Sequence, residues 1–164
     1  MKPSIYLFIL PLLMQPIFSE DWPGFGGVNG NFISSENKLK KTWGNQEPEK
    51  LWDHEIGLGF SSIIESNGLA YTQGYSNGKN NLYCVDVKSG EILWKSSFPC
   101  SKADDYFKGG SRSTPLGNDG NLYLSTHMGD VYCLNSQKGN IIWSLNMSKD
   151  LGGKRPTWGY AASP

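Results

Sequence analysis

Few residues of this chain have side chains suited to catalytic or metal chemistry, and they are scattered. The 164 residues include three cysteines, Cys84, Cys100 and Cys133, and two histidines, His54 and His127. No Cys-x-x-Cys pair occurs, whereas a structural zinc site takes four cysteine or histidine ligands at close spacing. The sequence therefore predicts no catalytic residue and no metal site. It leaves Cys100 as an odd thiol in a Pro- and Ser-rich loop.

Acidic residues offer two further possibilities. Asp104 and Asp105 are adjacent carboxylates beside Tyr106 and Phe107, but a solvated loop is the favoured interpretation. The segment 118–121, Asn-Asp-Gly-Asn, has the residue types of a calcium loop. It lacks the alternating spacing and the distal glutamate of such loops, so a hairpin turn is favoured there.

Basic residues suggest no charged partner. The formal net charge is zero, which argues against a nucleic-acid partner or an anionic membrane surface. Arg112 precedes an expected inner strand, where it could contact an anion. A salt bridge or a position at the rim is the favoured alternative for this side chain.

The chain repeats one segment. Residues 82–94 and 131–143 align without a gap, and the pairs Tyr83/Tyr132, Cys84/Cys133, Gly90/Gly139, Ile92/Ile141 and Trp94/Trp143 are identical. Self-similarity at 40 to 50 residues indicates a repeat architecture. Cysteines at equivalent positions of two repeats are expected as small buried core residues rather than as a disulfide pair.

Each repeat reads as four antiparallel strands. Asn67-Gly68 and Asp119-Gly120 are two-residue hairpin signals because these residues tolerate positive φ. We expect inner strands near 61 and 112, third strands over 82–86 and 131–135, and outer strands over 91–95 and 140–144. Residues 74–80 are interpreted as a long Gly-rich loop, and 127–130 as a short one. Four strands per 40 to 50 residues predict an all-β fold of β-propeller blades.

The expected organisation has three parts. Residues 1–19 form a secretory signal with Lys2, an apolar stretch over 5–14 and a small residue, Ser19, at the cleavage site. Residues 20–50 are an extended segment. Residues 51–164 form a partial propeller, with an outer strand at 50–53, blades over 57–95 and 109–144, and a third blade begun at 158. About two blades make an open arc, so we expect an N-terminal fragment of a longer propeller.

The repeats resemble a known family. Cys84, Asp86, Ser89, Gly90 and Trp94 match the tryptophan-docking motif of pyrroloquinoline-quinone (PQQ)-type propellers, with Cys for the usual Ala and Ser for Thr. In the second copy Cys133, Gly139 and Trp143 hold, while Asn135 replaces Asp and Lys138 replaces Thr. The flanks are similar to those of exported bacterial PQQ-like repeat proteins, at residues 21–27, 51–52, 57–62 and 158–164.

The resemblance implies a structural role for the motif, with a glycine turn and a tryptophan that packs between blades. The signal at 1–19 predicts export, to the periplasm or outside the cell, and the lack of a cysteine before Cys84 predicts a protein that is not lipid-anchored. The resemblance implies a protein-binding or scaffold module that acts without a cofactor. The outer-membrane assembly lipoprotein is similar in repeat type. The expected partner is a protein or the remaining propeller blades, with no nucleic acid and no membrane span.

Two alternatives stay open beside the scaffold hypothesis. One is a fragment of a quinoprotein dehydrogenase, in which PQQ and Ca²⁺ occupy the axis. The other is a truncated chain with no independent function. The residues expected to make contacts at the axial face are Arg112, Trp158 and Tyr160.

Overall fold

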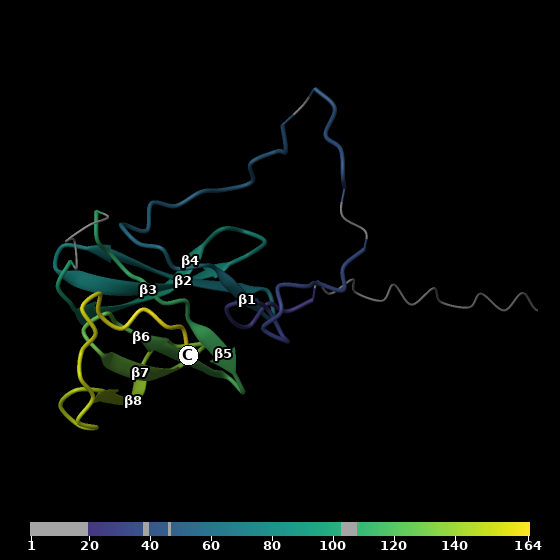
Figure 1. Cartoon of the computed structure of the whole chain (residues 1–164). Coiled ribbons are helices and arrows are strands. Elements are labelled where there is room, and N and C mark those ends of the chain that lie inside the picture. The colour runs from purple at the N-terminus through teal and green to yellow at the C-terminus, as the bar shows by residue number, and fades with distance from the viewer. Residues whose placement is uncertain (1–19, 38–39, 46, 103–107) are drawn as a thin grey trace, which may run out of the picture.

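The computed structural model describes residues 20–164 apart from 38–39, 46 and 103–107. Its regular elements are eight strands in two four-stranded antiparallel sheets (Figure 1). The first sheet contains β1 (Ile64–Ser66), β2 (Leu69–Ser76), β3 (Lys79–Asp86) and β4 (Ile92–Pro99). The second contains β5 (Leu116–Asn118), β6 (Asn121–Ser125), β7 (Asp130–Asn135) and β8 (Ile141–Asn146). The strands of each sheet lie in sequence order, which confirms the predicted all-β fold of four-stranded units.

The first turn of each sheet is the predicted Asx-Gly hairpin. Asn67 and Gly68 have φ of 54° and 77°, and Asp119 and Gly120 have φ of 47° and 74°. Two consecutive residues with positive φ make a type I′ turn, whose twist matches that of the flanking strands. A register shift also recurs at the same place in both sheets, after Cys84 and after Cys133.

Two predicted details were wrong. Residues 74–80 are not a loop, because β2 and β3 continue to a further tight turn at Asn77 and Gly78, whose φ values are 50° and 74°. Residues 50–53 form no strand. The inner strands begin later than expected, at Ile64 and Leu116, because residues 61–63 and 112–115 form no strand. The outer strands β4 and β8 run further than expected, to Pro99 and Asn146.

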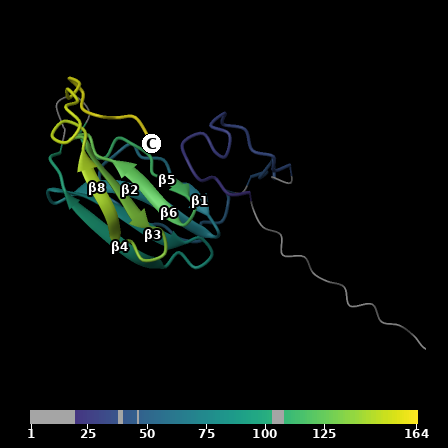
Figure 2. The ribbon, with the colours of Figure 1, turned by 90° about the horizontal axis from the view of Figure 1, so that it is seen from below.

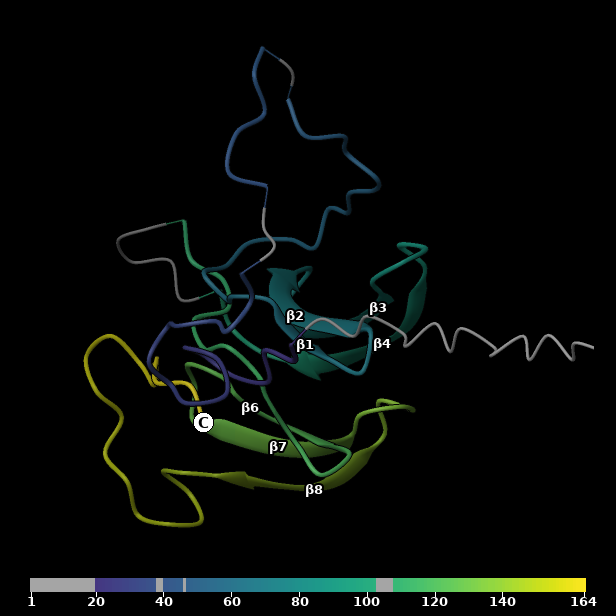
Figure 3. The same cartoon turned by 90° about the vertical axis from the view of Figure 1, so that its right-hand side faces the viewer.

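The two sheets stack face to face, one above the other (Figures 2 and 3). The core between them consists of eight buried side chains: Ile64, Tyr71, Leu82, Cys84, Phe98, Leu122, Leu124 and Leu134. The rings of Phe98 and Tyr132 meet across the sheets with centroids 4.2 Å apart. The other face of the first sheet is covered by Trp52 and Ile56, which pack against Ala70, Tyr83 and Val85.

The segment at 21–24 lies along the inner strands of both sheets. Trp22 and Glu65 exchange two backbone hydrogen bonds of 2.9 and 3.0 Å, so the segment adds a bridge to the free edge of β1. The Gly117 N–H on β5 donates to the Pro23 carbonyl at 2.7 Å. The segment thereby connects the inner edges of the two sheets. Among the described residues, no helix of the length and apolarity needed to cross a membrane is found.

Candidate docking face of the second sheet

Trp94 on β4 packs on the turn between β7 and β8. Its indole lies so close to Gly139 that a Cβ added there would be 2.5 Å from Trp94 Cε3. The indole Nε1–H donates to the Ser136 carbonyl at 3.0 Å, and the Ser96 hydroxyl donates to the Gly139 carbonyl at 2.6 Å. Asn135 shapes the turn, because its Oδ1 accepts from the N–H groups of the two residues that follow Ser136, at 3.1 and 2.9 Å.

The same arrangement occurs one repeat earlier. Trp52 packs on Gly90, where an added Cβ would lie 2.5 Å from the indole Cγ, and its Nε1–H donates to the Val87 carbonyl at 3.0 Å. The Asp86 carboxylate accepts from the Ser89 N–H at 2.7 Å and from the Ser89 hydroxyl at 2.9 Å. These bonds hold the pKa of Asp86 below its usual value. Although residues 50–53 form no strand, Trp52 occupies the docking position.

Equivalent faces of the two sheets differ in how far they are covered. On the first sheet the face that carries Trp94 is buried against the second sheet, with Ile64 and Leu82 at 0% exposure. The equivalent residues of the second sheet form what we call the open face: Leu116, Tyr123, Val131, Cys133 and Trp143. Strand pairing places Tyr123, Cys133 and Trp143 side by side across β6, β7 and β8. Trp143 is 43% exposed, and Leu116, Tyr123 and Val131 are only half-buried.

A groove runs along the open face. It has a volume of about 540 Å³ and is lined by Leu116, Tyr123 and Val131, with Pro23, Val28 and Pro164 at its border. On the edge strand β8, Ile141 and Ile142 are half exposed as well, although Ile141 pairs with Leu134 and so does not lie on the open face. An exposed apolar surface on a sheet and its edge strand is a site for pairing with another chain or element.

The segment at 160–164 touches the second sheet as 111–115 touches the first. The Thr114 hydroxyl accepts from the Ser62 N–H at 3.0 Å, and one repeat later the Ser163 hydroxyl accepts from the Thr114 N–H at 2.9 Å. The Ser125 hydroxyl donates to the Ala162 carbonyl at 3.1 Å. This segment therefore lies along the start of the open face.

Arg112, Trp158 and Tyr160, the residues expected at an axial face, contact this chain itself. The Arg112 guanidinium donates to the Trp158 carbonyl. The Tyr160 N–H donates to the His127 carbonyl at 3.1 Å, and its hydroxyl lies 3.1 Å from the Ser148 hydroxyl. The structure brings the three residues together beside the turn between β6 and β7. Asp104, Asp105 and their aromatic neighbours lie outside the described residues, as does the expected signal segment at 1–19.

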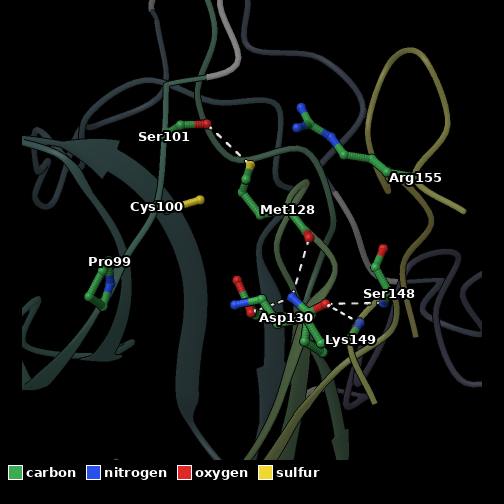
Figure 4. Close-up of a pocket in the computed structure, with 9 residues that line it drawn as sticks. Pro99, Cys100, Ser101, Met128, Asp130, Ser148, Lys149 and Arg155 are labelled. Atoms are coloured by element: carbon green, nitrogen blue, oxygen red, sulfur yellow. Dashed lines mark hydrogen bonds between the residues drawn. The ribbon is translucent and has the colours of Figure 1, made fainter. Parts of the chain in front are cut away.

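The three thiols differ in their surroundings. Cys84 and Cys133 are free and buried in the sheets, as predicted, and burial raises the pKa of Cys84 to about 11. Cys100 is half-buried beside His127, with Sγ 3.6 Å from Nδ1. It lines a cavity of about 450 Å³ together with Met128, Asp130 and Arg155 (Figure 4). Burial raises the pKa of Cys100 to about 11 and lowers that of His127, so thiol and imidazole are both neutral.

Sequence reasoning missed several of these features. The Asn77-Gly78 turn carries the same Asx-Gly signal as the two predicted hairpins. Trp52 stands 42 residues before Trp94, a repeat distance that marks it as a docking residue in spite of its irregular backbone. No signal in the sequence places Trp22 and Pro23 along the inner strands, because a single backbone bridge leaves no pattern of side chains.

Stacked four-stranded sheets, each docked by a tryptophan on a glycine turn, define a pair of β-propeller blades. The family described as outer membrane protein assembly factor BamB matches residues 78–158, just under half of the chain. Residues 78–158 thus match a PQQ-like repeat, and the two sheets form an open arc of propeller blades.

Individual relatives share short stretches with this chain. An uncharacterized protein of Rickettsia prowazekii (strain Madrid E) is 25% identical over 107 residues, 58% of this chain and 25% of that protein. A tetrathionate hydrolase of Acidianus ambivalens is 34% identical over 74 residues, 45% of this chain and 13% of that protein. The chain therefore spans a quarter or less of the length of these relatives.

Among solved structures, the quinohemoprotein alcohol dehydrogenase of Comamonas testosteroni superposes with a TM-score of 0.61 at 16% identity. The match covers 88% of this chain and 22% of that one. At this identity the likeness concerns the fold.

Proposed function

We propose that this chain is a non-catalytic propeller unit that binds protein through its open face. The observation that carries the proposal is the contrast between two equivalent faces. Ile64 and Leu82 of the first blade are completely covered, whereas Leu116 and Val131 at the same positions of the second blade are not. Apolar surface removed from water contributes roughly 25 cal/mol per Å², so a partner on this face would be bound largely by apolar burial.

The partner that fits the open face is another PQQ-like blade. Trp52 and Trp94 each pack on a glycine with positive φ and donate to the carbonyl three residues before it. Trp143 is the third tryptophan of this series and stands exposed on the open face. The partner must therefore present a glycine turn with a free carbonyl at the same spacing.

The inner edge of the blades supports a non-catalytic unit over the quinoprotein alternative. In this chain Trp22 and Pro23 bond to β1 and β5, so its own backbone lies along the inner strands where a cofactor on the axis would approach. Arg112 is engaged by the Trp158 carbonyl. The features of residues 1–19 support export, and we propose that the unit acts outside the cytoplasm.

The docking proposal is tested by adding the missing partner. A copy of residues 116–148 fused after Pro164 continues the repeat, because 160–164 align with 111–115. We expect the fusion to melt at a higher temperature than the parent chain. In the control fusion the added copy carries Gly139→Val, which places a side chain where the Trp143 indole should pack. Equal melting of both fusions and the parent would contradict the proposal.

The catalytic alternative has a separate test. PQQ and Ca²⁺ are added together to the protein, and both the quinone absorbance and the melting temperature are recorded. We expect neither to change. A Ca²⁺-dependent spectral change with stabilisation would favour the quinoprotein alternative, whatever the result with the fusions.

A further inference from the structure

The cavity at the ends of β4 and β8 contains an arrangement of sulfur and nitrogen atoms that the docking function does not use. Cys100 follows β4, and His127 and Met128 form the turn between β6 and β7. His127 is 3% exposed, while Cys100 and Met128 line the open cavity of about 450 Å³. Figure 4 shows both side chains among the residues that line this cavity.

Hydrogen bonds determine how the imidazole presents its lone pair. The Ser101 hydroxyl donates to Met128 Sδ at 3.3 Å and lies 3.0 Å from His127 Nε2. Since its one proton is used toward the sulfur, we assign Ser101 Oγ as the acceptor from Nε2–H. The lone pair is then on Nδ1, which faces the Cys100 thiol at 3.6 Å. A histidine ligand typically binds metal through one nitrogen while the other donates to a neighbouring group.

We propose that Cys100, His127 and Met128 form a binding site for a soft monovalent metal ion, with Cu⁺ as its natural chemical class. Thiolate and thioether ligands favour Cu⁺, and imidazole suits copper as well. A sulfur ligand lies about 2.3 Å and a nitrogen ligand about 2.0 Å from the ion they share. With a tetrahedral or trigonal angle at the ion, the two ligand atoms are then about 3.5–3.7 Å apart. The observed separation of 3.6 Å between Sγ and Nδ1 lies in this range.

Charge balance favours a monovalent ion over zinc. Binding of Cu⁺ replaces the thiol proton, which leaves to water, so the net charge of the site does not change. A divalent ion would add one positive charge to a site where Arg155 and Arg112 already disfavour positive charge on His127. The Asp130 carboxylate opposes their effect. The proposed ligand set is also only three side chains, one of them a thioether, which suits Cu⁺ rather than zinc.

The site escapes a search by sequence pattern. Cys100 and His127 are 27 residues apart, and they meet because β4 of one blade ends beside the turn between β6 and β7 of the next. Ligand spacing along the chain therefore predicts no metal site, and a methionine ligand has no spacing signal of its own.

The test is an anaerobic Cu⁺ titration of the whole chain against a colorimetric Cu⁺ chelator. We expect one equivalent to bind with a thiolate-to-copper absorption band. Cys100→Ser and His127→Gln should each weaken binding at least about 100-fold, and Ser101→Ala about 10- to 100-fold. Met128→Leu keeps the side-chain volume and should weaken binding less. Cys84 and Cys133 remain in every variant and serve as internal controls.

A second measurement needs no variant. Cys100 is alkylated in the native protein with and without one equivalent of Cu⁺, and the modified peptide is quantified by mass spectrometry. Protection of Cys100 by Cu⁺, and not by Zn²⁺, supports the site. Copper binding that is unchanged in Cys100→Ser, equal protection by both ions, or no protection at all would overturn it.

Discussion

Trp94 of the first blade lies on Gly139 of the second, and its indole N–H donates to the Ser136 carbonyl at 3.0 Å. Trp52 makes the same contact with Gly90 and the Val87 carbonyl. One docking unit, a tryptophan on a glycine turn, is therefore used twice in series. The third tryptophan, Trp143, lies on the exposed face of the second blade.

Replacing Gly139 should separate the cost of a clash with Trp94 from the cost of backbone strain at positive φ. Gly139→Ala brings a Cβ into the Trp94 indole and strains a residue with φ of +68°, so we expect a loss of about 2–4 kcal/mol in the free energy of unfolding. Gly120→Ala is the matched control, because φ is +74° and no atom lies within 4 Å of the added Cβ. Gly120→Ala should lower the free energy of unfolding, measured by chemical denaturation, by about 1 kcal/mol. Equal losses would show that the Trp94 contact contributes nothing.

Trp94 and Trp143 are equivalent by sequence but should differ in energy. Trp94→Ala removes a packed ring and its hydrogen bond to Ser136, and should destabilise the protein by about 2–4 kcal/mol. Trp143→Ala removes a ring that is already 43% exposed and should cost less than about 1 kcal/mol. Urea denaturation of the two variants checks this difference. A loss at Trp143 as large as that at Trp94 would mean that the second blade needs its own tryptophan to fold.

Much of the fold follows from local patterns in the sequence. The Asn67-Gly68 and Asp119-Gly120 turns fix the hairpins because few residues adopt two consecutive positive φ values. The repeat predicts the four strands of each blade, since its residues keep their spacing from Gly to Trp. The strand ends were less predictable. Asn77-Gly78 has the turn signal, but the polar residues around it resemble a loop.

The candidate sites were harder to predict than the fold. The docking motif identifies Trp94 and Gly139, yet only the structure shows that one faces the other across two blades while Trp143 faces outward. Cys100 and His127 meet through the relative placement of two sheets, a property that depends on the whole core. The bonds of Trp22 and Pro23 to the inner strands involve backbone atoms alone.

His127 should make stability depend on pH in the acid range. Burial, with Arg155 and Arg112, lowers its pKa in the folded protein below the ordinary 6.5, and Asp130 opposes this only in part. The unfolded state therefore takes up the proton first, so stability is present above pH 6.5 and is lost as pH falls through the folded pKa. Denaturation between pH 7.5 and 5 should show this loss, and His127→Gln should reduce it. An unchanged slope in the variant would contradict the assignment.

Asp21 should secure the N-terminal segment to the first hairpin. Its carboxylate accepts from the Ser66 hydroxyl at 2.9 Å and from the Asn67 N–H at 3.1 Å. Asp21→Ala should speed hydrogen exchange at the Asn67 and Glu65 amides, which bond to this segment. Glu20→Ala is the control, because Glu20 bonds to Ser34 and Ser35 instead. Exchange that is faster in both variants alike would point to a general loosening of the segment.

The exchange of the tryptophan indole protons tests the docking face most directly. In the chain alone, the indole N–H groups of Trp52 and Trp94 should be protected by their carbonyl partners, while that of Trp143 should exchange rapidly. In the fusion that carries a second copy of residues 116–148, the indole N–H of Trp143 should become protected like that of Trp94. It should stay unprotected when the added copy carries Gly139→Val. A Trp143 indole that exchanges rapidly in both fusions would contradict the proposal that this face binds a further blade.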